Sequence, residues 1–94
     1  MAASHFSALK TATVSVDLPS IATVTTAAVD VTVPGIAVGD MLSVYRPIAL
    51  NDDLVVAGYR IKAADTVTLF IYNPTGGAID DAAQPWEFVW WDRT

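Results

Sequence analysis

Apolar and polar residues alternate along most of the 94-residue chain, and alternation with a period of two predicts β-strands. No stretch shows the 3.6-residue apolar period of an amphipathic helix. We expect strands in TATVSVDL, IATVTT, AAVDVTVPG, MLSVYRP, LVVAGYRIK, VTLFIYN and WEFVWW. Six or seven short strands at near-regular spacing predict an all-β fold, either an antiparallel β-sandwich or a jelly-roll-like barrel.

The breaks between these segments carry turn residues. The apolar parity switches between Val24 and Val29, so we expect a bulge or turn near Thr26 to Ala28. AADT, just before VTLFIYN, predicts a hairpin in which Asp65 forms the turn. The longest irregular stretch is NPTGGAIDDAAQP, and its NPT triplet is not a glycosylation acceptor because proline occupies the middle position.

The length of the chain corresponds to one domain. Its first ten residues are weakly patterned. We therefore predict a flexible N-terminal arm, residues 1–10, ahead of a single β-sandwich domain, residues 11–94. Such an arm is either frayed or becomes ordered on a partner.

The composition favours association with other chains. Hydrophobic residues make up 53% of the sequence and the mean hydropathy is +0.44, which is high for a small soluble domain. Small domains gain extra stability from disulfides, metals or oligomerisation. Because cysteine is absent, disulfides and thiolate metal sites are excluded, and oligomerisation is the favoured route.

The charge argues against two classes of partner. The formal net charge is −5, and the five lysines and arginines are scattered. Binding to nucleic acid or to an anionic membrane needs clustered positive charge, so we expect neither partner. No apolar run has signal-peptide character or approaches the ~20 residues of a membrane-spanning helix. We therefore expect a protein made in the cytoplasm.

The sequence shows no catalytic signature. His5 is the only histidine and lies in the weakly patterned N-terminus, where no carboxylate would hold it. The pairs Asp52–Asp53 and Asp80–Asp81 are expected in loops as solvated carboxylates. A Ca²⁺ ion held by the second pair and nearby carbonyls is the alternative. With neither a phosphate-binding loop nor a nucleophile elbow, we predict a protein that is not an enzyme and holds no cofactor or metal.

The aromatic residues carry the functional argument. In WEFVWW, three aromatic side chains share one face of the strand and Trp91 lies on the other, whereas a sandwich strand normally has a single apolar face. The aromatic side chains form a monomer core, a subunit interface or a sugar-stacking platform. We favour the interface. Its predicted residues are Trp86, Phe88, Trp90, Trp91, Phe70 and Tyr72.

Several of these segments resemble small structural proteins of tailed bacteriophages, the head-decoration (cement) and head-fibre proteins. The similarity covers residues 29–91: a Val-rich strand into PG, then GD opening the next strand, AADTVT in a hairpin, and NPTGGAID before the final strand. The resemblance implies a β-sandwich without catalytic residues that forms homotrimers on the outer head surface. The partners would be sister chains and the major capsid protein, with residues 2–10 reaching the capsid or a neighbouring subunit.

Two other interpretations fit the sequence. A receptor- or glycan-binding module of a phage tail fibre or spike would need an exposed tryptophan beside the 51–53 or 80–84 loops. A small tail-tube or connector protein would form rings of higher order than trimers.

Overall fold

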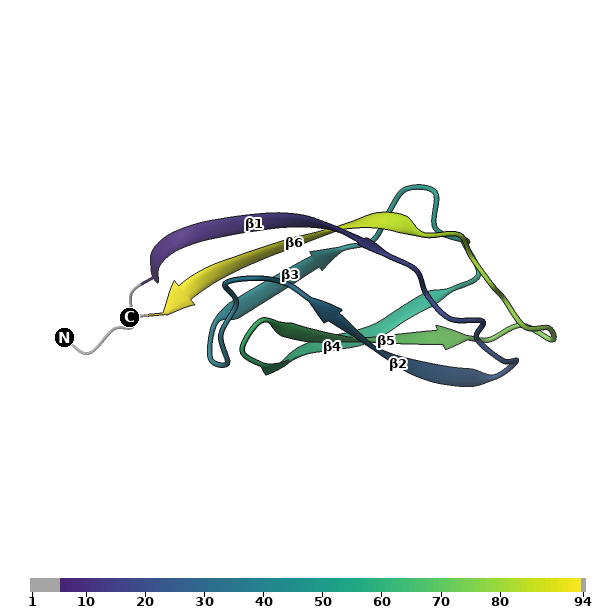
Figure 1. Cartoon of the computed structure of the whole chain (residues 1–94). Coiled ribbons are helices and arrows are strands. Elements are labelled where there is room, and N and C mark those ends of the chain that lie inside the picture. Colours follow the sequence, from purple (N-terminus) through teal and green to yellow (C-terminus); the bar gives the residue numbers. More distant parts are fainter. Residues whose placement is uncertain (1–5, 94) are drawn as a thin grey trace.

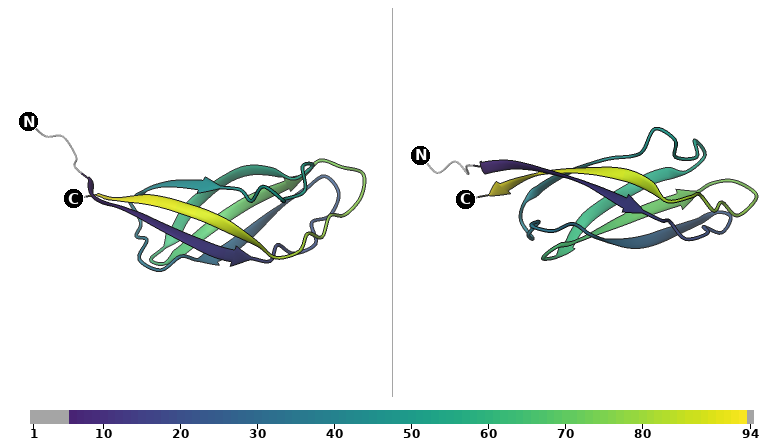
Figure 2. Two further views of the ribbon diagram at one scale, coloured as in Figure 1. Left: turned by 90° about the horizontal axis from the view of Figure 1, so that it is seen from above. Right: turned by 45° about the horizontal axis from the view of Figure 1, so that its top comes forward.

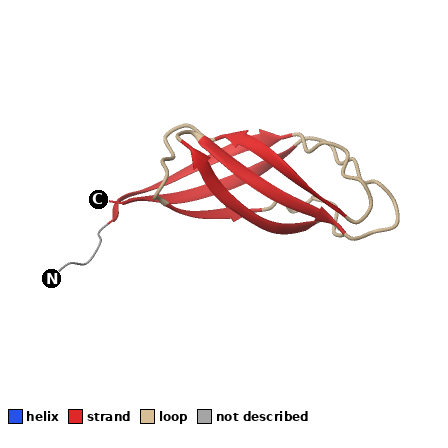
Figure 3. Cartoon of the chain, turned by 90° about the horizontal axis from the view of Figure 1, so that it is seen from below, coloured by secondary structure: helices blue, strands red, loops and turns tan. Residues whose placement is uncertain are grey.

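The computed structural model describes the backbone of residues 6–93 and the side chains of residues 9–91. Every regular element in this part of the chain is a β-strand (Figure 3). The strands are β1 (Phe6–Val16), β2 (Thr25–Thr32), β3 (Met41–Tyr45), β4 (Val55–Ala63), β5 (Thr66–Asn73) and β6 (Gln84–Arg93). They form two antiparallel three-stranded sheets, which confirms the predicted all-β class and is compatible with a small β-sandwich.

One sheet has the strand order β1–β6–β3 and the other β2–β5–β4. The two sheets form separate layers (Figures 1 and 2). Only the β4–β5 connection is a hairpin within one sheet, because the chain changes sheet at every other connection. The first residues of β1 pair with the last residues of β6, so both ends of the described chain lie at the same end of the molecule (Figure 1).

The core lies between the two central strands. Alternation on β6 turns Trp86, Phe88 and Trp90 toward the opposite sheet, where they are almost completely buried. β5 contributes its own inward set from the same period of two, namely Val67, Leu69 and Ile71. Buried loop residues extend the core at its ends; these are Leu18, Ile21, Ile36, Leu50 and Leu54.

One predicted turn is wrong in position. The expected bulge near Thr26 to Ala28 is absent, because these residues pair regularly with β5. The chain instead turns at residues 23–24, where Val24 has a φ of +51°. Val24 is exposed and does not face the core as Val29 does. The change of apolar parity between Val24 and Val29 is therefore caused by this turn. The predicted strand IATVTT is reduced to a single bridge between Ile21 and Ile79, with its last two residues opening β2.

The predicted boundary of the N-terminal arm is also wrong. β1 begins at Phe6, and residues 6 and 8–10 pair with β6, with a register shift between Phe6 and Ala8. Backbone hydrogen bonds to a neighbouring strand can extend a strand through residues whose side chains show little alternation. The sandwich therefore starts at residue 6, and His5 lies outside the described residues.

Candidate interaction surface

Among the side chains that the structure describes, the outer face of the β1–β6–β3 sheet is poor in charge. Residues directly opposite in an antiparallel ladder share a face, so the register fixes the outward set. Its rows across the sheet are Leu9–Trp91–Met41, Thr11–Val89–Ser43, Thr13–Glu87–Tyr45 and Ser15–Pro85. Only Glu87 of these eleven positions is charged.

The first row is apolar throughout. Leu9 is 60% exposed and Met41 49% exposed, and Trp91 lies half-buried between them. Val89, in the second row, is also half-buried. Three large apolar side chains in contact range across a sheet form a surface that water solvates poorly. This end of the sheet therefore offers a small apolar patch next to both ends of the described chain.

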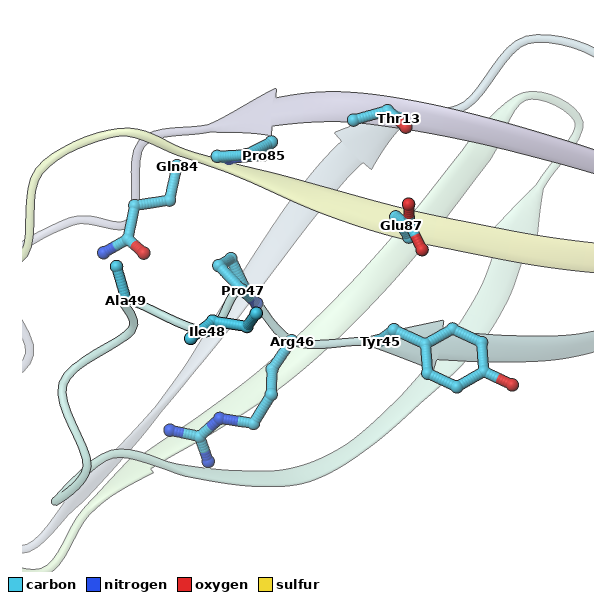
Figure 4. A pocket seen from close by; sticks show the side chains of 9 residues that line it. All are labelled: Thr13, Tyr45, Arg46, Pro47, Ile48, Ala49, Gln84, Pro85 and Glu87. Atoms are coloured by element: carbon cyan, nitrogen blue, oxygen red, sulfur yellow. The ribbon is translucent and has the colours of Figure 1, made fainter.

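A groove of about 520 Å³ adjoins the other end of this face. Figure 4 shows its side chains, which come from all three strands and from the loop after β3. The lining residues are Thr13, Tyr45, Arg46, Pro47, Ile48, Ala49, Gln84, Pro85 and Glu87. Because three of them form the third row of the sheet, the groove and the charge-poor face are one continuous surface.

The loop between β3 and β4 is held by a network of hydrogen bonds. The Arg46 guanidinium donates to the carbonyl oxygens of Leu54 and Asn51 at 3.0 and 3.1 Å. The Asn51 backbone N–H donates to the Asp81 carboxylate at 2.8 Å, while Leu50 and Leu54 are buried. Ile48, at the tip of the loop, is fully exposed. The loop thus presents an apolar side chain to solvent from an ordered backbone.

The outer face of the β2–β5–β4 sheet has a different character. It carries an ion pair between Lys62 and Asp30, whose N–O distance is 2.8 Å. The Thr68 hydroxyl donates to the same carboxylate at 2.7 Å, and these two hydrogen bonds, chiefly the one from Lys62, lower the pKa of Asp30. Arg60 lies over the Phe70 ring, 5.9 Å from its centroid. This face has the mixed charge of an ordinary solvated surface.

The six predicted interface residues do not form one surface. Trp86, Phe88 and Trp90 are in the chain's own core, so the opposite sheet, and not a sister chain, covers them. For these three side chains the monomer-core interpretation is correct. Phe70 and Tyr72 lie half-buried on the outer face of β5, and Trp91 lies on the outer face of the other sheet.

Sequence reasoning missed three exposed apolar residues of the candidate surface: Leu9, Met41 and Ile48. The alternation in MLSVY places Met41 on the same face of β3 as Tyr45, and that pattern could have identified it. Exposure of Ile48 depends on contacts between distant segments, which no local pattern reveals.

The paired aspartates occupy loops, as expected. Asp52, Asp53 and Asp80 are exposed, whereas Asp81 accepts hydrogen bonds from the Asn51 backbone and the Gln84 side chain. The 51–53 and 80–84 loops therefore meet, but the nearest tryptophan in sequence, Trp86, is buried. Among the described side chains, those of residues 9–91, no three acidic or histidine side chains come close enough to hold a metal ion.

Comparisons with models of protein families, with curated proteins and with solved structures find no match for this chain. In the part of the chain that the structure describes, no helix is long and apolar enough to cross a membrane. The functional interpretation therefore depends on the surface itself and on the sequence resemblance.

Proposed function

We propose that the protein is a structural component of a bacteriophage virion, a capsid decoration (cement) protein that binds the outer head surface as a homotrimer and stabilises the shell. The observation that carries the proposal is the charge-poor outer face of the β1–β6–β3 sheet, continuous with a groove and an ordered loop that exposes Ile48. Large exposed apolar side chains on a rigid frame favour binding to another protein surface.

The groove itself supports binding rather than catalysis. Its two charged side chains are Arg46 and Glu87. The Arg46 guanidinium is engaged by two backbone carbonyl oxygens and stabilises the loop. A general acid or base needs neighbouring groups that orient it toward a substrate, whereas Glu87 is an exposed side chain on the sheet face.

In this proposal the protein acts through binding energy alone. A trimer on the head surface would contact several copies of the major capsid protein, so that weak local contacts combine through effective concentration. Binding to the assembled shell, and not to free subunits, shifts the equilibrium toward the intact head. The protein would be made in the host cytoplasm and reside on the capsid exterior.

The proposal is tested on heads of the phage that encodes this chain, prepared with and without the protein. Heads that lack it should rupture at a lower temperature, and adding back the purified protein should restore the higher temperature. Rupture can be followed by DNA release with an intercalating dye. Identical rupture temperatures in the three samples would exclude a cement role.

One observation favours the alternative, a receptor- or glycan-binding module of a phage tail fibre or spike. The exposed Tyr45 ring lies in the groove with Thr13, Gln84 and Glu87, and sugars bind where an aromatic ring adjoins a few polar groups. Saturation-transfer NMR against a panel of bacterial surface sugars tests it. Signals that disappear in Tyr45→Ala, but persist in Tyr59→Ala on β4, would support this alternative.

A further inference from the structure

We propose that copies of the chain associate through the outer face of the β1–β6–β3 sheet together with Ile48 and the adjoining groove. The occupant of this surface is a second copy of the same chain. The inference rests on the proposed function, which calls for a self-assembling protein, and it names the surface that makes the contact.

The distribution of charge favours a second copy as the occupant. Each chain carries a formal charge of −5, so two copies repel one another, and the repulsion is smallest where surfaces with few charges meet. The β1–β6–β3 face presents one carboxylate, Glu87, among eleven positions. The opposite outer face presents Asp30, Arg60 and Lys62, which already interact with one another or with Phe70. Self-contact is therefore least costly on the β1–β6–β3 face.

The shape of this surface suits contact between identical chains. Ile48 is fully exposed and is itself one of the residues that line the groove, with Tyr45, Pro47 and Pro85. Apolar side chains on this surface can pack against the same surface of another copy, because contacts about a two-fold axis are reciprocal. The hydrogen bonds of Arg46 and Asn51 already fix the conformation of the β3–β4 loop in the single chain. The loop therefore loses little conformational freedom on binding.

The small size of the sheet face favours a contact that includes the loop. Three strands about 4.8 Å apart and seven residues at about 3.3 Å each give a flat outline of roughly 330 Å². A stable contact buries about 800 Å² on each partner. The sheet face alone falls short, so both its apolar first row and the Ile48 region should contribute.

Light scattering behind a sizing column, with the full chain and three variants, tests the inference. The wild type should have a mass at least twice the 10.0 kDa of one chain. Met41→Asp and Ile48→Asp should each weaken self-association by about tenfold or more, because both place a charge in the contact. Val55→Asp is the matched control: Val55 pairs with Tyr72 on the other outer face and is 45% exposed, against 49% for Met41.

The outcomes separate this inference from the decoration role. A wild-type monomer, or an oligomer whose mass survives both Met41→Asp and Ile48→Asp, would overturn the proposed surface, whatever the head-rupture experiment shows. Dissociation by Val55→Asp alone would also overturn it, by moving the contact to the β2–β5–β4 sheet. Circular dichroism confirms that each variant is folded. Ile48 is fully exposed in a loop, so its variant keeps the test valid if Met41→Asp does not fold.

Discussion

Asn73 is a fully buried amide at the end of β5, and its hydrogen bonds connect this end of the strand to the following turn and to the segment around Ile21. Its Nδ2 donates to the carbonyl oxygens of Ile21 and Gly77 at 2.9 and 2.8 Å. Its Oδ1 accepts from the backbone N–H and the hydroxyl of Thr75 at 2.9 and 2.7 Å. Every hydrogen-bonding group of the amide is therefore used, although in the sequence this residue only opens a turn-rich stretch.

We expect Asn73→Ala to lower the free energy of unfolding by about 3 kcal/mol, because it removes a fully buried amide together with the four hydrogen bonds that this amide makes. Urea denaturation measures the change. Asn51→Ala is the control, since its Oδ1 accepts one hydrogen bond from Asp53 in an exposed turn, and it should cost about 1 kcal/mol or less. Equal losses in the two variants would show that burial of the Asn73 amide adds nothing.

Asp30 gives the β2–β5–β4 sheet a dependence on pH. The hydrogen bonds from Lys62 and Thr68 lower the pKa of its carboxyl below the ordinary value of 3.8. A lowered folded-state pKa contributes stability above that value and loses it as the pH falls through the folded pKa. Asp30→Asn should therefore melt below the wild type at pH 7, with a difference that shrinks below pH 3.8. Asp52→Asn, in an exposed loop, controls for the loss of one charge, and a constant difference for Asp30→Asn would contradict the prediction.

At the scale of the elements, the β4–β5 turn links the hairpin to the loop after β2. Asp65 adopts a φ of +61°, and its carboxylate accepts a hydrogen bond from the Gly35 N–H at 2.8 Å. Its backbone carbonyl and N–H also bond to Val33 and Ile36. The turn residue thus anchors a segment some thirty positions away in sequence.

Two substitutions at this turn separate the side-chain bond from the backbone conformation. Asp65→Asn keeps an acceptor oxygen and tolerates positive φ, so the free energy of unfolding should change by less than about 0.5 kcal/mol. Asp65→Ala loses the acceptor and is strained, and should cost about 1–2 kcal/mol. Thermal or urea unfolding ranks the two, and a smaller loss for Asp65→Ala than for Asp65→Asn would refute this account.

Local alternation was sufficient to predict most strands, because period two directly fixes which side chains can face a core. It predicted the inward set of β5 and the one-sided aromatic row of β6. Alternation could not predict what covers the aromatic row of β6, because the packing of Trp86 against the opposite sheet depends on the tertiary fold. The start of β1 at Phe6 and the exposure of Ile48 likewise depend on pairing and hydrogen bonds between distant segments.

For the whole molecule, the accessible surface shows that a single chain exposes about as much area as an ordinary folded domain of its mass. Its accessible area is 5400 Å², and a compact monomer of this mass is expected to expose about 5,200 Å². The high mean hydropathy suggested a fold completed by other chains. Many of the large apolar side chains behind that value are instead buried in the chain's own core. Association would then join folded subunits through a preformed face, and folding would not require it.

Coupling between folding and association gives the last prediction. A partner that binds only the folded state raises the melting temperature with its concentration. The wild type should therefore melt at a higher temperature when concentrated than when dilute, whereas Met41→Asp, which associates more weakly, should show a smaller rise over the same range of concentration. On dilution the two curves should converge, because Met41 is half-exposed in the single chain and contributes mainly through the contact. Scanning calorimetry over a dilution series measures these melting temperatures, and Val55→Asp is expected to follow the wild type. If Met41→Asp melts below the wild type by the same amount at every concentration, the Met41 side chain stabilises the subunit itself and not the contact between copies.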